Sequence, residues 1–348
     1  MRGRQILIEP LPKGGHAAAL MVDGRLEDLL VDPDPADPTP RPEAIFRAIP
    51  ARPMKGLGGV MLDLGAGRTG FLRGPKLPAP GRSLLVQVTG VAEPGKAQPV
   101  SARPILKARH AILTPGAPGI NVARSLRDPD RRAALEALGT AAMAGAEADL
   151  GLILRTAAIE APDDRIAADI AALRAEWAGL APAGAPGLLR PAPGARDEAL
   201  REWREPGDPV RDAPTAFTEA GIWDEIDALR RPEVPLAGGG FMAIEPTRAL
   251  VAVDVNTGGD TSPAAGLKAN LAAATELPRQ LRLRGLGGQI VVDFAPMPRP
   301  ERVRVERALA HALRTDGIDT TLVGWSPLGH LELQRKRARQ PLASVART

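Results

Sequence analysis

The chain has 348 residues, 44% of them hydrophobic and 25% charged, with a formal net charge of +4, so it can bury a large core in more than one domain. It contains no cysteine, which excludes disulfides and thiolate metal sites and favours a cytoplasmic location. The N-terminus lacks a signal-peptide pattern and no run of about 18 apolar residues occurs, so we expect no membrane span.

The beginning of the chain predicts strands. Two short apolar runs, 5–8 and 17–22, indicate a β-hairpin. A stretch rich in proline and aspartate, 32–42, indicates a linker. We therefore assign residues 1–40 to a group of N-terminal strands.

A small β-barrel is predicted next, over residues 41–106. Strand-like runs such as 59–64 and 83–91 alternate there with glycines and prolines.

An α/β region is predicted over residues 107–185. Residues 131–145 indicate a helix and 150–155 a strand. One face of a second helix is marked by four apolar residues that we expect to face the core: Ile166, Ile170, Leu173 and Trp177. Segments 181–197 and 205–214 are rich in proline, glycine and alanine and predict connectors, so we assign 186–232 largely to a linker.

The last region, 233–341, contains two short apolar runs that each end near an aspartate, Asp254 and Asp293. Both runs predict buried strands, and helical spacing lies between them, so the strands should be parallel. Both carboxylates should then lie at one sheet edge, with Asn256 beside the first. A strand-end aspartate is often only a turn former or helix N-cap. Two together form an oxygen-ligand site suited to Mg²⁺ and to phosphoryl chemistry.

The charges are segregated along the chain. Residues 41–110 contain 12 Lys or Arg against three acids, and residues 279–348 contain 13 against six. Two basic blocks on an otherwise acidic chain favour binding to a nucleic-acid backbone. Only 3% of the residues are aromatic, so base stacking can use few positions. The four histidines show no zinc-like spacing, and we expect them to be surface or packing residues.

Three motifs carry a family resemblance: AVDVNTGGD at 252–260, LKANLAAATELPRQLRLRGLGGQIVVDF at 267–294, and GHLELQRKR at 329–337. They closely resemble the catalytic core of the ribonuclease E/G family of bacterial endoribonucleases. Weaker similarity lies in GRLEDLLVD at 24–32, LDLGAGRTGFL at 62–72 and ILRTA at 153–157.

The resemblance implies roles for seven residues. Asp254 and Asp293 would hold a catalytic Mg²⁺, and Asn256 would position the scissile phosphate. Phe71 and Lys96 would contact RNA, although Phe71 also suits a barrel core. Arg155 and Thr156 would form a pocket for a 5′-monophosphate, using a guanidinium and a hydroxyl.

The resemblance also implies a fold and a substrate. The fold is a multi-subdomain α/β protein with an S1-type oligonucleotide-binding barrel and a DNase-I-like catalytic core whose sheet is mostly parallel or mixed. Residues 1–40 and 186–232 would form a reduced ribonuclease-H-like subdomain, and 342–348 a tail. The substrate would be A/U-rich single-stranded RNA, cleaved to 5′-phosphate and 3′-hydroxyl ends.

Several positions depart from the family pattern. Pro327 replaces an arginine of the 5′ pocket, Ala108 replaces a glycine and Met61 replaces a barrel aromatic. Pro278 falls inside the crossover helix and should kink it. The loop after Asn256 is shorter than usual. The paired cysteines that link family protomers through zinc are missing, so we expect no structural zinc and a monomer or dimer.

We interpret the chain as a metal-dependent endoribonuclease, which the intact set of Asp254, Asn256 and Asp293 favours. Two alternatives remain. One is an RNA-binding protein of the same family that has lost turnover, which the altered pocket and shorter loop favour. A Mg²⁺-dependent phosphohydrolase acting on small molecules fits the aspartates but not the two basic blocks.

Overall fold

The computed structural model describes residues 3–262 and 264–342 of the chain. The chain divides into two compact units, each described here by itself. The first combines Met1–Asp37 with Asp208–Thr348, and the second is Pro38–Gly207. Residues 343–348 of the predicted tail lie outside the described residues. Among the helices of the described residues, none has the length and apolar character that a membrane span requires.

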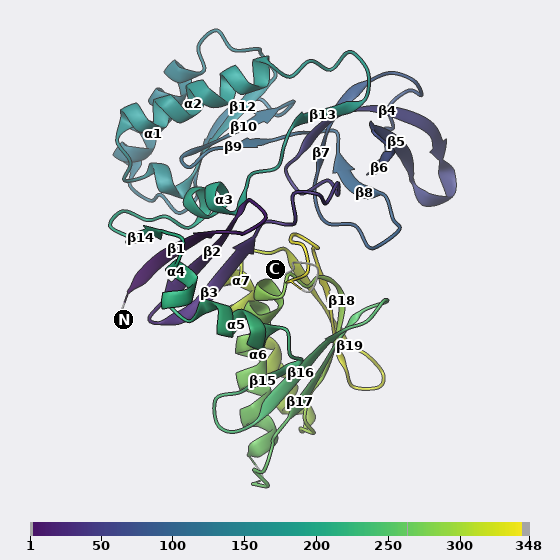
Figure 1. The fold of residues 1–348 in the computed structure, drawn as a ribbon, viewed down its shortest axis with the longest axis vertical. Helices are drawn as coiled ribbons and strands as arrows, with labels where there is room; N and C mark the ends of the chain where they lie inside the picture. The colour runs from purple at the N-terminus through teal and green to yellow at the C-terminus, as the bar shows by residue number, and fades with distance from the viewer. Residues whose placement is uncertain (1–2, 263, 343–348) are drawn as a thin grey trace. The chain divides into compact units, whose positions relative to one another are not determined.

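A four-stranded sheet opens the first unit, in the order β14-β1-β2-β3. Its elements and the two helices on it are β1 (Arg4–Pro10), β2 (His16–Val22), β3 (Arg25–Val31), β14 (Val210–Asp212), α4 (Ala216–Glu219) and α5 (Ile222–Leu229). The predicted hairpin is confirmed by the antiparallel β1–β2 pair. One face of the sheet packs on Phe217, Ile222 and Ile226 of the helices, which gives this small layer its own apolar core (Figure 1).

A six-stranded mixed sheet forms the rest of the first unit, in the order β15-β16-β17-β18-β20-β19. Its elements are β15 (Glu233–Pro235), β16 (Phe241–Pro246), β17 (Val251–Asn256), α6 (Ala265–Leu283), β18 (Gly288–Asp293), α7 (Arg299–Thr315), β19 (Thr320–Trp325) and β20 (Leu331–Arg335). The predicted parallel pairing is confirmed, because β17 and β18 are parallel and joined by α6. The other neighbours in the sheet pair antiparallel.

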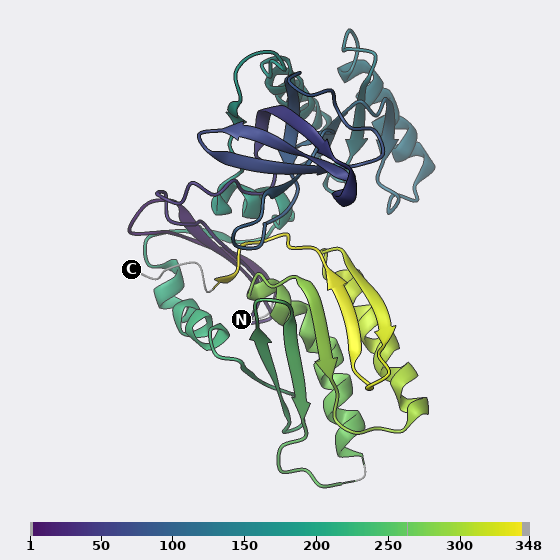
Figure 2. The ribbon, with the colours of Figure 1, turned by 90° about the vertical axis from the view of Figure 1, so that its right-hand side faces the viewer.

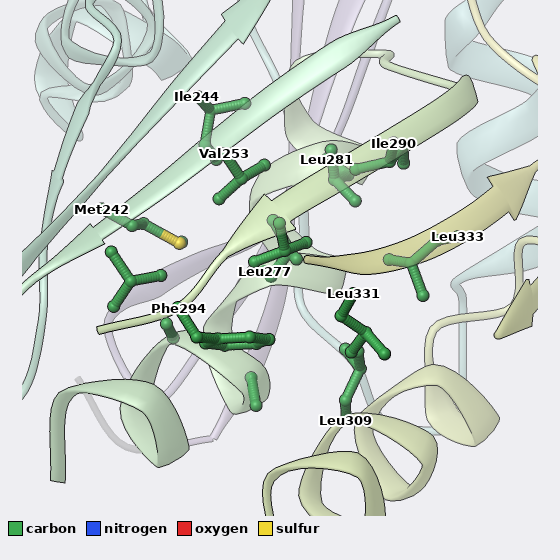
Figure 3. Close-up of a cluster of buried hydrophobic side chains, with 14 of the residues drawn as sticks. Met242, Ile244, Val253, Leu277, Leu281, Ile290, Phe294, Leu309, Leu331 and Leu333 are labelled. Carbon is green, nitrogen blue, oxygen red and sulfur yellow. The ribbon is translucent and has the colours of Figure 1, made fainter. Parts of the chain in front are cut away.

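Helices α6 and α7 cover one face of this sheet together (Figure 2). Alternate strand residues such as Val253, Ile290 and Leu333 point toward the helices and meet Leu277 and Leu281 of α6 (Figure 3). Burial of each such side chain contributes about 1.5–3 kcal/mol. Helix α6 continues across Pro278 to Leu283, so the proline removes one backbone hydrogen bond without ending the helix.

The second unit contains the predicted barrel. Its strands are β4 (Ile45–Met54), β5 (Gly59–Gly65), β6 (Arg68–Arg73), β7 (Leu84–Val88) and β8 (Gln98–Ser101), with η1 (Lys55–Leu57) after β4. The strands follow the order β4-β5-β6-β8-β7, and β7 pairs back with β4, which closes a five-stranded barrel. Phe46, Leu62 and Val86 fill its interior. The expectation of an S1-like barrel is therefore confirmed.

Beside the barrel in this unit lies a small sheet in the order β11-β12-β10-β9. Its elements and helices are β9 (Leu106–Lys107), β10 (Ala111–Pro115), β11 (Gly119–Val122), α1 (Pro129–Ala142), β12 (Leu150–Leu154), η2 (Thr156–Ala158) and α2 (Asp163–Ala178). Both longer helices pack on the sheet (Figure 1). The predicted core face of the second helix is confirmed: Ile166, Ile170 and Leu173 are buried, and Trp177 packs against them.

The connector prediction for 181–197 and 205–214 was partly wrong. Within these segments the chain forms β13 (Gly187–Arg190), the first turn of α3 (Ala195–Glu202) and β14. Strand β13 pairs with β4 at the edge of the barrel sheet, and Ala195 and Ala199 bury one side of α3. These elements are short and are flanked by proline and glycine, which are typical of connectors. The strands form only because they pair with partners far away along the chain, which a local pattern does not indicate.

Candidate active site and anion pocket

Two aspartates stand at the carboxyl ends of the parallel strands β17 and β18. Alternate residues of each strand are buried, so Val253 and Val292 enter the core while Asp254 and Asp293 are exposed on the opposite face. The aspartates are direct partners in the parallel register, and neighbouring strands lie about 4.8 Å apart. Their carboxylates therefore leave the same face of the sheet side by side, away from α6 and α7.

Asn256 lies on the same face, two residues after Asp254. Its side-chain Nδ2 donates a hydrogen bond of 2.7 Å to Oδ2 of Asp254. A primary amide carries two N–H bonds. One can therefore orient the carboxylate of Asp254 while the other points to a further oxygen ligand.

Glycines allow the chain to turn sharply at the end of β17. A Cβ atom on Gly240 would lie 2.5 Å from the carbonyl oxygen of Asn256. Gly258 has φ +64°, and a Cβ there would lie 2.6 Å from the carbonyl oxygen of Gly239. These close backbone approaches explain how the short loop after Asn256 is held against the neighbouring hairpin loop.

His330 is a site residue that sequence reasoning missed. Its Nε2 lies 3.8 Å from Oδ2 of Asp293. Strand β20 runs antiparallel to β18 with Leu331 opposite Val292, so the residue before Leu331 reaches the end of β18. The sequence placed it inside the motif GHLELQRKR at 329–337, just before an alternating strand pattern, but neither signal reveals the partner strand.

The donor set fits a hard divalent cation. Two carboxylates on adjacent strands repel each other, and a cation between them removes that repulsion. Mg²⁺ commonly takes one or two carboxylates and completes its shell with water and phosphate oxygens. Within 3–262 and 264–342, His, Cys, Asp and Glu side chains form no cluster of three or more that could hold a metal ion. Asp254 and Asp293, whose positions are paired in the register, are the residues that would hold Mg²⁺ if it binds at this edge.

Comparison with known proteins adds the family. The model of the Ribonuclease E/G family matches residues 105–206 and 208–338, well over half of the chain. This chain belongs to the ribonuclease E/G family. It is 31% identical to ribonuclease E of Nostoc sp. strain PCC 7120 over 307 residues, which is 76% of this chain and 44% of that protein.

Two further relatives set the extent of the similarity. Ribonuclease E of Synechocystis sp. strain PCC 6803 is 29% identical over 312 residues, covering 77% of this chain and 45% of that protein. Ribonuclease G of Salmonella typhimurium strain SL1344 is 38% identical over 133 residues, covering 36% of this chain and 26% of that protein. The chain thus spans somewhat under half the length of these two ribonuclease E relatives.

The two predicted RNA contacts of this family member belong to the barrel. Phe71 lies in β6, is half-buried and stands outside the buried cluster of the barrel. Its ring packs over Gly59 of β5, and the guanidinium of Arg73 lies 5.7 Å from the ring centroid. Lys96 precedes β8, the strand that pairs with β6, and its Nζ lies 2.6 Å from Oε2 of Glu93. The RNA role of both residues stays a prediction.

The predicted 5′-phosphate pocket lies at the end of β12. Arg155 donates 2.8 Å from Nη1 to the carbonyl oxygen of Ala108, and its Nη2 pairs with the carboxylate of Glu202. The hydroxyls of Thr156 and Ser125 are 3.1 Å apart. The guanidinium that was predicted to bind phosphate is therefore already bound to an anion of the chain itself.

Glu202 belongs to a larger ion network. Its second oxygen accepts 2.8 Å from Nε of Arg201, whose two terminal nitrogens each donate 2.8 Å to Glu43. Lys107 adds a further 2.8 Å contact to Glu43. Burial opposes the charge of Glu43, but Arg201 and Lys107 outweigh it and hold the pKa of this carboxyl below its ordinary value. Sequence reasoning missed Glu202 because α3 lies in the segment taken as a linker.

Proposed function

We propose that this protein is a Mg²⁺-dependent endoribonuclease that hydrolyses single-stranded RNA in RNA processing or decay. The observation that carries the proposal is the register of β17 and β18, which pairs Asp254 directly with Asp293. This exposed pair stands in a chain of the ribonuclease E/G family. The whole-protein activity is proposed because the chain spans less than half of its ribonuclease E relatives.

The chemistry would be phosphodiester hydrolysis. A Mg²⁺ ion held by Asp254 and Asp293 would supply an activated water and stabilise the charge on the phosphate. Asn256 keeps one carboxylate oriented through its 2.7 Å hydrogen bond and offers its second N–H to a phosphate oxygen. Attack of water breaks the bond between phosphorus and the 3′ oxygen. The upstream fragment receives the proton as a 3′-hydroxyl, and the downstream fragment keeps a 5′-phosphate.

The barrel would hold the single strand. Phe71 is exposed enough for a base to stack on it, and Arg73 beside the ring and Lys96 before β8 supply positive charge. A preference for A/U-rich sequences is proposed from the resemblance. Arg155 and Thr156 would receive the 5′-phosphate of the substrate.

A cleavage assay tests the proposed function. A fluorescent A/U-rich oligomer is incubated with the protein and Mg²⁺, and a matched sample contains EDTA. We expect cleavage to fragments with 5′-phosphate ends in the first sample only. Binding without cleavage at any Mg²⁺ concentration would favour the RNA-binding protein without turnover, and cleavage in EDTA would exclude the metal mechanism.

A further inference from the structure

The guanidinium of Arg155 is held between two acceptors of the chain. One is the carbonyl oxygen of Ala108 at 2.8 Å, and the other is the carboxylate of Glu202. The side chains of Arg155 and Glu202 are only 21% and 27% exposed. An ion pair that is largely shielded from water is stronger than one on the open surface. An incoming anion must therefore compete with Glu202 for Arg155.

Glu202 is charged when it makes this contact. Burial alone would raise the pKa of its carboxyl, but the hydrogen bond and charge of Arg155, together with Arg201, hold that pKa below the ordinary value. Its other oxygen accepts from Nε of Arg201 at 2.8 Å. If Arg155 is taken by another anion, Glu202 still keeps this second partner. The exchange does not leave a buried carboxylate without a counter-charge.

A second arginine stands beside the same pair. Arg109 follows Ala108 directly, and its Nη1 donates 3.0 Å to the carbonyl oxygen of Arg201, the residue before Glu202. Arg109 and Arg155 therefore contact two consecutive residues of α3, Arg201 and Glu202. Burial and then the like charge of Arg155 lower the pKa of Arg109. Glu202 pairs with Arg155 and also offsets the charge of Arg109, with a smaller share from Glu205, so one carboxylate is shared between two guanidinium groups. A phosphate monoester carries nearly two negative charges at neutral pH and can satisfy both.

We infer that Glu202 is a resident anion in a phosphate site formed by Arg155, Arg109 and Thr156, and that it limits the preference of the protein for 5′-phosphorylated RNA. This inference rests on the proposed function, in which the 5′ end of the substrate enters this pocket. A 5′-hydroxyl offers no charge and leaves Glu202 in place, whereas a 5′-phosphate must displace it. The family pattern has a second pocket arginine where this chain has Pro327. In our inference Arg109 supplies the second guanidinium instead.

The test measures binding in the full chain carrying Asp254→Asn, so that RNA is not cut. Fluorescence anisotropy gives Kd for two matched oligomers that differ only in a 5′-phosphate or a 5′-hydroxyl. In Glu202→Gln we expect the 5′-phosphorylated oligomer to bind about tenfold tighter than in the unchanged pocket, a gain of about 1.4 kcal/mol. The 5′-hydroxyl oligomer should bind within about twofold of its original Kd.

Three further variants make the result specific. Glu136→Gln removes the same charge from an exposed position on α1 and should shift both oligomers alike. Adding Arg155→Gln to Glu202→Gln should abolish the gain, and adding Arg109→Gln should reduce it. An unchanged preference in Glu202→Gln, or equal tightening of both oligomers, would overturn the inference.

The design distinguishes failure of the Glu202 inference from failure of the proposed hydrolysis. If Glu202→Gln does not fold, Glu202→Asp replaces it, because the side chain is one methylene shorter and its carboxylate lies farther from Arg155. This variant must also increase the preference for the 5′-phosphorylated oligomer. If the wild-type protein binds with this preference but does not cleave RNA, the proposed hydrolysis fails and the role of Glu202 stands. If it cleaves RNA and Glu202 has no effect on 5′ preference, the reverse holds.

Discussion

Asp254 and Asp293 lie side by side, and within the described residues neither makes an ion pair with a lysine or arginine. The buried Asp316 differs, because it pairs with both Arg282 and Arg335. The aspartate pair instead has only the amide of Asn256 and the imidazole of His330 nearby. Two adjacent carboxylates without a basic counter-charge are costly unless a cation binds.

The first prediction concerns these carboxylates. Asp254→Asn and Asp293→Asn should each abolish Mg²⁺-dependent cleavage, because a neutral amide is a poor ligand for the ion, while RNA affinity stays nearly unchanged. Single-turnover cleavage and anisotropy measure the two effects. Glu245→Gln, which removes a charge from β16 opposite Ala252, two residues before Asp254, should retain activity. Turnover above about a tenth of wild type, a barrier change below about 1.4 kcal/mol, would rule out a metal role for that aspartate.

The second prediction concerns the 5′ end. With Glu202 bound to Arg155, the wild-type protein should prefer 5′-phosphorylated over 5′-hydroxyl substrates by about tenfold or less, equal to at most about 1.4 kcal/mol. Initial cleavage rates on matched oligomers measure this ratio. A hundredfold preference that Arg155→Ala removes would show that the resident carboxylate does not restrain the pocket.

At the scale of elements, two phenylalanines of the barrel strands lie on opposite sides of the barrel wall. Phe46 on β4 is buried in the barrel interior, whereas Phe71 on β6 lies on the outer side over Gly59. The alternation of a strand explains the difference, since Leu72 next to Phe71 enters the core. This arrangement favours RNA stacking over a packing role for Phe71.

The third prediction follows from that position. Phe71→Ala should weaken single-strand binding by about 1–3 kcal/mol with little loss of folding stability, because a stacking surface is removed and no core cavity forms. Phe46→Ala is the matched control and should lower the free energy of unfolding by about 3–5 kcal/mol. Titrations with a short oligomer and urea unfolding give the two quantities. A Phe71→Ala protein as unstable as Phe46→Ala would support the core role instead.

The fourth prediction concerns the ion network of the second unit. Arg201 and Lys107 keep the pKa of Glu43 below its ordinary value of 4.5, so its ion pairs stabilise the fold fully above pH 4.5. This stabilisation should disappear as pH falls below 4.5 through the lower folded-state pKa. Glu43→Gln should lower the free energy of unfolding on the order of 2 kcal/mol at neutral pH.

Urea unfolding at neutral pH and at about pH 3 tests the direction, since the difference between wild type and Glu43→Gln should shrink in acid. Glu147→Gln, far less buried and outside the network, should show no such pH dependence. A difference that grows in acid would mean that Glu43 is not charged in the folded protein.

At the scale of the whole molecule, the second basic block predicted from the sequence divides into two groups. Arg282, Arg335 and Arg339 are tied into ion pairs with Asp316 and Asp28. Arg304, Arg307 and Arg314 are exposed on α7 instead. The exposed group, together with exposed Arg299 and Lys336, is placed to meet phosphate, whereas the paired group is not, so the charge count overstates the surface available to RNA.

The fifth prediction concerns assembly. Because the sequence contains no cysteine, the protein should hold no stoichiometric structural zinc and should be a monomer or dimer. Elemental analysis and sedimentation velocity measure these properties. One zinc per chain, or a stable tetramer that EDTA dissociates, would contradict the prediction.

The sequence by itself determined the active-site edge. Apolar runs of strand length, a helical stretch between them and the handedness of crossovers place Asp254 and Asp293 at one edge without any tertiary information. The barrel and the core face of α2 followed in the same way, because their patterns are local and repeat with the period of the element.

Tertiary structure alone decided which distant groups meet. His330 reaches Asp293 through an antiparallel register, β13 joins β4 from about 140 residues away, and Glu202 reaches Arg155 from a helix in a proline-rich segment. A local pattern reports which face of an element is buried, but not which other element covers it. Pairing across long sequence distances depends on the complete packing of the chain, and the contacts that set specificity belong to that level.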